Sequence, residues 1–193
     1  VVGEIYVRCD PFANDYVIDK LEARGIRALF APFTEWLEYT DFVNRNVIRS
    51  DTGLGAQFTS LIQRGILGRL YNLLAGPLGW PPRTTVKQSI ETAGPYIPSK
   101  LLGEAVLTVG GPLHEYRHGH IDAVLSVGPL ECMPCKIAEA QYFHVLAREG
   151  LPSLTLSLNG EPLDPAPLES FVFQVRRRFA AREAGRARPA EVG

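Results

Sequence analysis

Two cysteines three positions apart are the residues of this 193-residue sequence best suited to chemistry. They are Cys132 and Cys135 in the stretch SVGPLECMPCKIA, where a short apolar segment leads into a helical pattern. A Cys-x-x-Cys pair can be a disulfide switch, half of a zinc site or part of the ligand set of an iron–sulfur cluster. A helix N-terminus favours the thiolate, which is the form that binds soft metals. The third cysteine of the chain is Cys9.

The elements around these cysteines predict an α/β fold. Each of four short segments is rich in β-branched residues or leucine and is bounded by Gly, Pro, Asp or Asn, so we expect strands at Glu4–Arg8, Ile26–Ala31, Ile121–Val127 and Ser153–Leu158. Helical patterns follow them, from Asp10-Pro11 to Gly25, from Pro134 to Gly150, and from about Pro165 onward. This alternation predicts a Rossmann-like, doubly wound and mostly parallel sheet.

The predicted sheet places all three cysteines at one edge. Cys9 follows the first predicted strand, and Cys132 and Cys135 follow the third. Ligands of open α/β sheets bind outside the carboxyl ends of the strands. Three thiolates with an open fourth position could hold an iron–sulfur cluster, so we predict Cys9, Cys132 and Cys135 as its metal ligands. The alternative for Cys9 is that it is only a small buried residue.

The long segment between the second and third predicted strands has helical character. We expect an amphipathic helix over residues 58–74 that ends at Gly76-Pro77, and two more at Val86–Thr92 and Ser99–Val109. The sequence therefore predicts one α/β domain over residues 1–180, with a helical insertion at about 42–120, from a larger protein. Residues 181–193 are predicted to be a flexible, arginine-rich tail.

Composition limits the compartment and the partners. The chain is 46% hydrophobic and 21% charged with a net charge of −1, which is typical of a soluble globular domain and indicates no nucleic acid and no membrane as partner. Three cysteines do not suit a secreted disulfide framework, so we expect a cytoplasmic protein.

A second motif, His114-Glu-Tyr-Arg-His118, has the form of a zinc protease site. It lies between Gly110-Gly111-Pro112 and Gly119, which leaves room for about two helical turns. The pattern therefore favours a polar helix face over a metal site. The sequence contains no Ser/His/Asp set, no P-loop and no Gly-x-Gly-x-x-Gly motif, so we predict no catalytic residue and leave open whether the chain is an enzyme.

Several stretches resemble one superfamily in order along most of the chain: GEIYVRCDPFANDYVIDKLEARGIRALFAPFTEWLEY, SKLLGEAVLTVGG, HGHIDAVLSVGPLECMPCKIAEA and PSLTLSLNGE. They are similar to the 2-hydroxyacyl-CoA dehydratase and CoA-enzyme activase superfamily, in particular to the uncharacterised domain found beside ASKHA-type ATPase activase domains. Cys132 matches the family's Cys-Met-Pro cysteine. Cys135 and Cys9 depart from the family pattern.

The resemblance implies an oxygen-sensitive iron–sulfur (4Fe–4S) protein that performs electron transfer or reductive activation in the CoA-thioester metabolism of anaerobes. It implies an ASKHA-type ATPase or a dehydratase-like protein as partner, and a homodimer is possible. One alternative is a cluster-free structural or interaction lobe of the larger protein. Another is thiol–disulfide exchange, because CMPCK followed by a helix also resembles a thioredoxin active site, although only sixteen residues separate Cys135 from Pro152.

Overall fold

Three parallel strands form the sheet, in the spatial order β1 (Val2–Gly3), β2 (Val124–Pro129) and β3 (Ser153–Leu158). The computed structural model describes residues 1–48 and 53–187. The short β1 pairs with the middle of β2, and β2 pairs with β3 along its whole length. The predicted α/β class with a parallel sheet is therefore confirmed.

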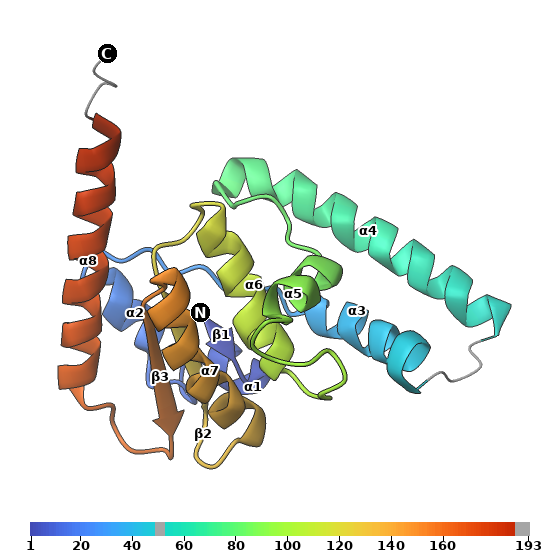
Figure 1. The fold of residues 1–193 in the computed structure, drawn as a ribbon, viewed down its shortest axis with the longest axis horizontal. Helices are drawn as coiled ribbons and strands as arrows, with labels where there is room; N and C mark the ends of the chain where they lie inside the picture. The colour runs from blue at the N-terminus through green and yellow to red at the C-terminus, as the bar shows by residue number, and fades with distance from the viewer. Residues whose placement is uncertain (49–52, 188–193) are drawn as a thin grey trace.

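Helices lie on both faces of this sheet (Figure 1). In chain order they are α1 (Ile5–Cys9), α2 (Val17–Glu22), α3 (Thr34–Val43), a π-helical turn η1 (Asn44–Ile48), α4 (Leu54–Leu78), α5 (Val86–Ala93), α6 (Ala105–Arg117), α7 (Met133–Glu149) and α8 (Pro165–Ala187). Apolar side chains of α5, α6 and α7 pack over one face, and those of α2 and α8 pack over the other. The sheet is thus covered on both faces, as a parallel sheet requires.

The first predicted strand is wrong. Residues 2–3 form β1, but Ile5–Cys9 is a helix, α1. The Glu4 side chain accepts a hydrogen bond from the backbone N–H of Val7 at 2.7 Å, which caps the first helical turn. An apolar run with one acidic residue in front of it suits a buried strand and a capped short helix equally well, and here the cap decides.

The second predicted strand, Ile26–Ala31, has no regular strand structure. It nevertheless occupies the position of an edge strand beside β1. Val1 donates its N–H to the carbonyl oxygen of Leu29, and the N–H of Ala31 donates to the carbonyl oxygen of Val1 at 3.0 Å. These two bonds to residues 29 and 31 are the pattern of one parallel bridge. The pairing does not extend further, because β1 itself has only two residues.

Other element boundaries shift. β2 begins at Val124, not at Ile121, and β3 matches the prediction. The helix predicted at Ser99–Val109 is α6, which starts six residues later and continues through Pro112. The long α4 does not end at Gly76-Pro77 but at Leu78, where Gly79 adopts a left-handed conformation with φ 59°. Pro77 fits inside the last turn of α4, while the glycine that ends the helix comes two residues later.

The C-terminal helix α8 runs to Ala187 and so includes the first part of the segment predicted to be a tail. Residues 188–193 of that prediction lie outside the described residues. Within residues 1–48 and 53–187, we find no helix with the length and apolar content needed to cross a bilayer.

Candidate functional site

The Cys132–Cys135 pair lies at the carboxyl edge of the sheet, where the sequence predicts it. β2 ends at Pro129, and a tight turn follows in which Glu131 has φ 62° and the N–H of Cys132 donates to the carbonyl oxygen of Pro129 at 3.2 Å. Cys132 is the N-cap residue of α7, and its carbonyl oxygen accepts from the N–H of Lys136 at 2.9 Å. The turn therefore delivers both thiols to the first turn of one helix.

The two thiols differ in environment. Cys132 is partly exposed and Cys135 is buried, and both are free cysteines. Burial, together with a hydrogen bond to the Cys132 side chain, raises the pKa of the Cys135 thiol to about 12, although a backbone hydrogen bond from Glu4 opposes this. The thiolate that we expect at a helix N-terminus is therefore not favoured at Cys135, because desolvation outweighs the field of α7.

The remaining predicted ligand is not brought to this pair. Cys9 is the last residue of α1 and is exposed. In the described part of the chain, no three His, Cys, Asp or Glu side chains are placed so that they could share a metal ion. The structure thus joins Cys132 to Cys135 and leaves Cys9 outside the group, because α1 replaces the strand that would have carried Cys9 to the edge.

Gly128 determines how closely α7 approaches β2. A Cβ at this position would overlap Sγ of Cys135 and lie 3.2 Å from its Cβ. Gly103, which has φ 119°, lies close to Pro134 of the Cys-x-x-Cys turn. A Cβ added to this glycine would be 3.7 Å from Cγ of Pro134. The Cys-x-x-Cys turn is therefore clamped between β2 and the loop that precedes α6.

A buried charged pair lies beneath the same edge. Arg8 of α1 is 3% exposed, and its Nη1 is 3.5 Å from Oε1 of Glu35 in the first turn of α3. Nε of Arg8 has no hydrogen-bond partner. Burial raises the pKa of Glu35 to about 7 even though Arg8 opposes the shift. Burial also raises the pKa of Glu104, the residue before α6, and Arg8 again opposes the shift. Arg8 and Glu104 were not predicted to be part of the site.

The thiols should differ in their reaction with an alkylating reagent. At pH 8 we expect iodoacetamide to modify Cys9 and Cys132 at least about tenfold faster than Cys135, because only the thiolate reacts and Cys135 is both buried and protonated. Peptide mass spectrometry after timed quenching measures the three rates. In urea the three cysteines should react at equal rates, which provides the reference. Equal rates in the folded protein as well would contradict this description of Cys135.

The histidine motif is part of the end of α6. His114 lies in the helix and His118 is its C-cap residue. Glu115, which would be the base of a zinc protease, is held by two other partners: its Oε1 accepts from the Thr84 hydroxyl, and its Oε2 lies 2.6 Å from Nδ1 of His120. These contacts are those of a polar helix end, as the sequence favours.

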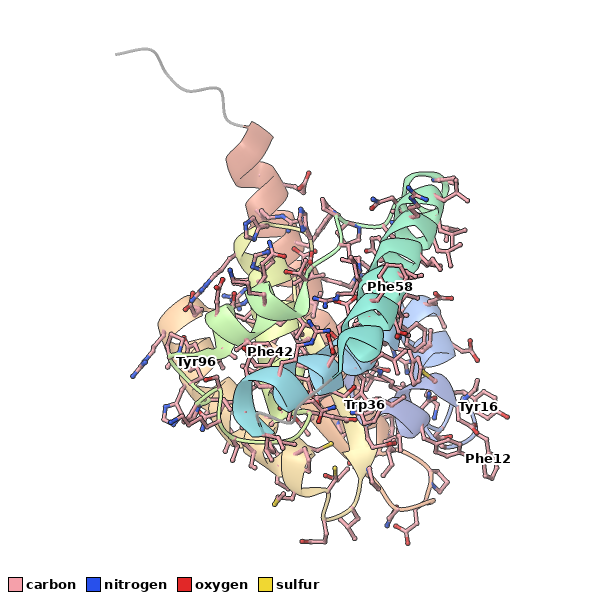
Figure 2. All side chains as sticks on the ribbon, turned by 90° about the vertical axis from the view of Figure 1, so that its right-hand side faces the viewer. Phe12, Tyr16, Trp36, Phe42, Phe58 and Tyr96 are labelled. Atoms are coloured by element: carbon pink, nitrogen blue, oxygen red, sulfur yellow. The ribbon has the colours of Figure 1, made fainter. Side chains whose placement is uncertain are left out.

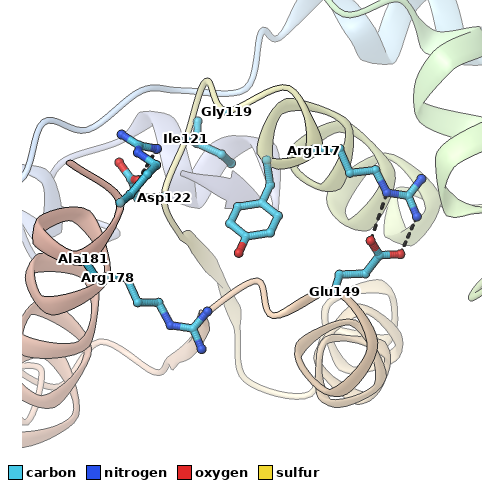
Figure 3. Close-up of a pocket in the computed structure, with 9 residues that line it drawn as sticks. Arg117, Gly119, Ile121, Asp122, Glu149, Arg178 and Ala181 are labelled. Atoms are coloured by element: carbon cyan, nitrogen blue, oxygen red, sulfur yellow. Dashed lines mark hydrogen bonds and ion pairs between the residues drawn. The ribbon is translucent and has the colours of Figure 1, made fainter. Parts of the chain in front are cut away.

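A cavity lies at the opposite, amino edge of the sheet (Figure 3). It has a volume of about 530 Å³ and is lined by residues that precede β2 and β3 and by the last turns of α8. Its arginines are already bound: Arg117 pairs with Glu149, Arg182 with Asp122, and Arg178 donates to the carbonyl oxygen of Gly150. Two of the three arginines that line the pocket are therefore paired with carboxylates, and the third is hydrogen-bonded to a backbone carbonyl.

Comparison with known proteins does not identify a family for this chain. The chain matches no family model, no curated protein and no solved structure. Its fold is therefore described from its own strands and helices, and the chemistry of the site rests on the thiol pair.

The thiol pair fits part of a metal or cluster site. Two thiols in contact have the soft donor atoms that iron–sulfur clusters and zinc require. A 4Fe–4S cluster is held by about four cysteines, and a structural zinc ion also has about four ligands. The described residues of one chain bring two such thiols together, so a site of either kind would need further ligands from another domain or another chain.

Proposed function

We propose that this chain is an α/β lobe of an activase- or dehydratase-like iron–sulfur protein. In this proposal Cys132 and Cys135 are two of the cluster's ligands, and a partner supplies the others. The single observation that supports it is the side-by-side placement of the two thiols at the N-terminus of α7, on the edge of a parallel sheet where ligands bind. The partner that the resemblance implies is an ASKHA-type ATPase activase domain, a dehydratase-like protein or a second copy.

Each part of the site has a defined task in this proposal. A bound cluster supplies one-electron transfer at low potential, which the resemblance links to reductive activation in CoA-thioester metabolism. Cys132 is partly exposed and can face a partner, while Cys135 anchors the site from inside the sheet edge. Binding must remove the proton of Cys135, so metal binding will release protons and strengthen as the pH rises.

The test is metal content after anaerobic reconstitution with ferrous iron and sulfide. Two copies of the unaltered chain can supply four thiols between them, so we expect the unaltered chain to retain iron and sulfide. Cys132→Ser and Cys135→Ser should lose them, with Cys9→Ser as the matched control that keeps them. Cluster absorbance and electron paramagnetic resonance identify the species bound. Iron and sulfide retained equally by Cys132→Ser would contradict the proposal, and zinc in their place would make the pair a structural site.

A second candidate, thiol–disulfide exchange, is favoured by the asymmetry of the pair. In such exchange the thiolate of the exposed cysteine attacks a substrate disulfide and releases one thiolate; the buried cysteine then loses its proton and attacks the mixed disulfide, releasing the second. The partly exposed Cys132 and the buried, protonated Cys135 suit these two roles. Equilibration with a glutathione buffer tests this. A Cys132–Cys135 disulfide that forms and breaks reversibly, without bound metal, would replace the cluster proposal.

A further inference from the structure

Along α8, the helix face that packs on the sheet changes from apolar to basic. Phe171, Val172 and Val175 are buried in the apolar cluster that α8 forms with the sheet. The positions three and seven residues beyond Val175, which lie on the same face of the helix, are Arg178 and Arg182. Both line the cavity of about 530 Å³ at the amino edge of the sheet. Packing favours apolar side chains on such a face, so these two arginines require another explanation.

Two of the three arginines around the cavity have carboxylate partners. Nη1 of Arg182 lies 2.5 Å from Oδ1 of Asp122, and Nε of Arg117 donates to Oε2 of Glu149 at 3.1 Å. Tyr96, labelled in Figure 2 on the segment that follows α5, donates its hydroxyl to Oε1 of Glu149 at 3.0 Å. The hydrogen bond from Arg117 lowers the pKa of the Glu149 carboxyl, which is therefore ionised at neutral pH. These two pairs neutralise Arg117 and Arg182 and leave the third arginine.

Arg178 has no carboxylate partner in the described part of the chain. Its Nη1 donates to the carbonyl oxygen of Gly150, which also accepts a hydrogen bond from the Tyr116 hydroxyl at 3.2 Å. This bond caps the C-terminus of α7 and uses one donor of the guanidinium. Nε and Nη2 have no acceptor among the described residues, and Figure 3 shows the side chain reaching from α8 toward the middle of the cavity. Two parallel N–H groups of this kind bind a carboxylate through both of its oxygens.

We propose that the cavity at the amino edge binds a small carboxylic acid in its ionised form, with Arg178 as the residue that holds the carboxylate. The ligand then supplies the acceptor that the described chain does not provide for Nε and Nη2 of this arginine. The inference goes beyond the proposed function and does not depend on it, because it uses neither cysteine and no metal.

The charge of the lining favours a ligand with a single negative charge. Three arginines and the carboxylates of Asp122 and Glu149 line the cavity, which gives a net charge of +1. The last turns of α6 and α7 also contribute residues to the lining, and a helix C-terminus carries about half a negative charge. The lining therefore accommodates one negative charge at most. A carboxylate meets this condition, whereas a phosphate monoester carries about 1.5 to 2 negative charges at neutral pH.

The uncharged part of the lining indicates the body of the ligand. Ile121, Ala181 and the ring of Tyr116 contribute apolar surface to the cavity. Its volume of about 530 Å³ lies within the range of small-molecule sites, which combine apolar walls with a few polar groups that fix the orientation of the ligand. A carboxylate attached to an apolar or aromatic body fits both features. Benzoate is the simplest probe of this class.

A heteronuclear NMR titration of the full chain with benzoate, without added iron, tests the site. We expect benzoate to shift the amide signals of Gly119, Ile121 and Ala181, which line the cavity, and to leave those of Cys132 and Cys135 unchanged. A ligand of this size should bind with a Kd of about 0.1–1 mM. Benzyl alcohol, which has no charge, and phenyl phosphate, which has too much, should bind more weakly. Unchanged cavity signals at about 10 mM benzoate, or tighter binding of either comparison compound, would overturn the proposal.

Substitution of two neighbouring arginines tests the role of Arg178. Arg178→Gln should weaken benzoate binding at least about tenfold, because hydrogen bonds between opposite charges are lost. Arg177→Gln is the matched control: it removes the same charge from an exposed position that does not line the cavity, and it should bind benzoate like the unaltered chain. Arg178→Lys keeps the charge without the planar fork and should bind with intermediate affinity. Arg178 is itself exposed, so these variants should keep their helical circular dichroism. Full affinity in Arg178→Gln, or equal losses in both glutamine variants, would overturn the proposal.

Discussion

Gly110→Ala is expected to destabilise the protein by about 3 kcal/mol, at the upper end of the range for overpacked positions. Gly110 lies in α6, where the helix crosses α5 at close range. A Cβ at this position would overlap the backbone carbonyl oxygen of Ser89 and lie 2.7 Å from its carbonyl carbon. The atoms that it meets belong to a helical backbone and cannot rotate away. The two helices must separate, which loosens the layer that also includes α7.

Urea denaturation and thermal unfolding measure this effect. A loss of about 3 kcal/mol corresponds to a decrease in Tm of about 6–12 °C for a domain of this size. The matched control is Gly65→Ala in the exposed middle of α4, where nothing lies within 4 Å of the added Cβ. That change should raise the stability by about 0.5–1 kcal/mol, because alanine has the higher helix propensity. Equal effects at both positions would contradict the close approach of α5 and α6.

The same glycine explains why the sequence misplaces α6. The run Gly110-Gly111-Pro112 has the composition of a turn, and local propensity alone would end a helix there. In the structure α6 continues through all three residues. Gly110 is needed for the approach to α5, and Gly111 likewise lies against Ser89. Tertiary packing selects these residues, and a pattern read along one segment contains no information about the helix that packs against it.

The strand predictions succeed or fail for the same reason, because a local pattern does not show which backbone segment will pair with a strand. β3 is predicted correctly because all six of its residues pair with β2. The N-terminal segment is misread because its pairing involves only Val2 and Gly3, after which the Glu4 side chain caps a helix. An apolar run of five residues does not indicate whether its backbone N–H and C=O groups form hydrogen bonds with a neighbouring strand or within a helix.

The candidate site is predicted in its position but not in its composition. Cys132 and Cys135 follow the central strand directly, so strand and helix patterns alone place them at the carboxyl edge. The grouping of Cys9 with them rested on a strand that is a helix. The pairing of Arg8 with Glu35 could not be predicted, because the two partners come from separate helices.

Glu35 should make the stability of the protein depend on pH. Burial raises the pKa of its carboxyl from 4.5 to about 7 in the folded protein, whereas the unfolded chain keeps the ordinary value. Between these two values the folded state binds more protons than the unfolded state, so the free energy of unfolding falls as the pH rises through this range. The contribution is present below pH 4.5 and lost above pH 7, and a shift of this size corresponds to about 3 kcal/mol.

Glu35→Gln isolates this effect, because glutamine keeps the shape of the side chain and does not titrate. We expect the decrease in stability between pH 5 and pH 8, measured by urea denaturation, to be about 3 kcal/mol smaller in the variant than in the unaltered protein. Glu91→Gln, at an exposed position on α5, should leave the pH dependence unchanged. Parallel stability curves for Glu35→Gln and the unaltered protein would mean that Arg8 holds Glu35 ionised at neutral pH. The pair would then be a permanent salt bridge beneath the thiol site, and attraction to Arg8 would outweigh the desolvation of Glu35.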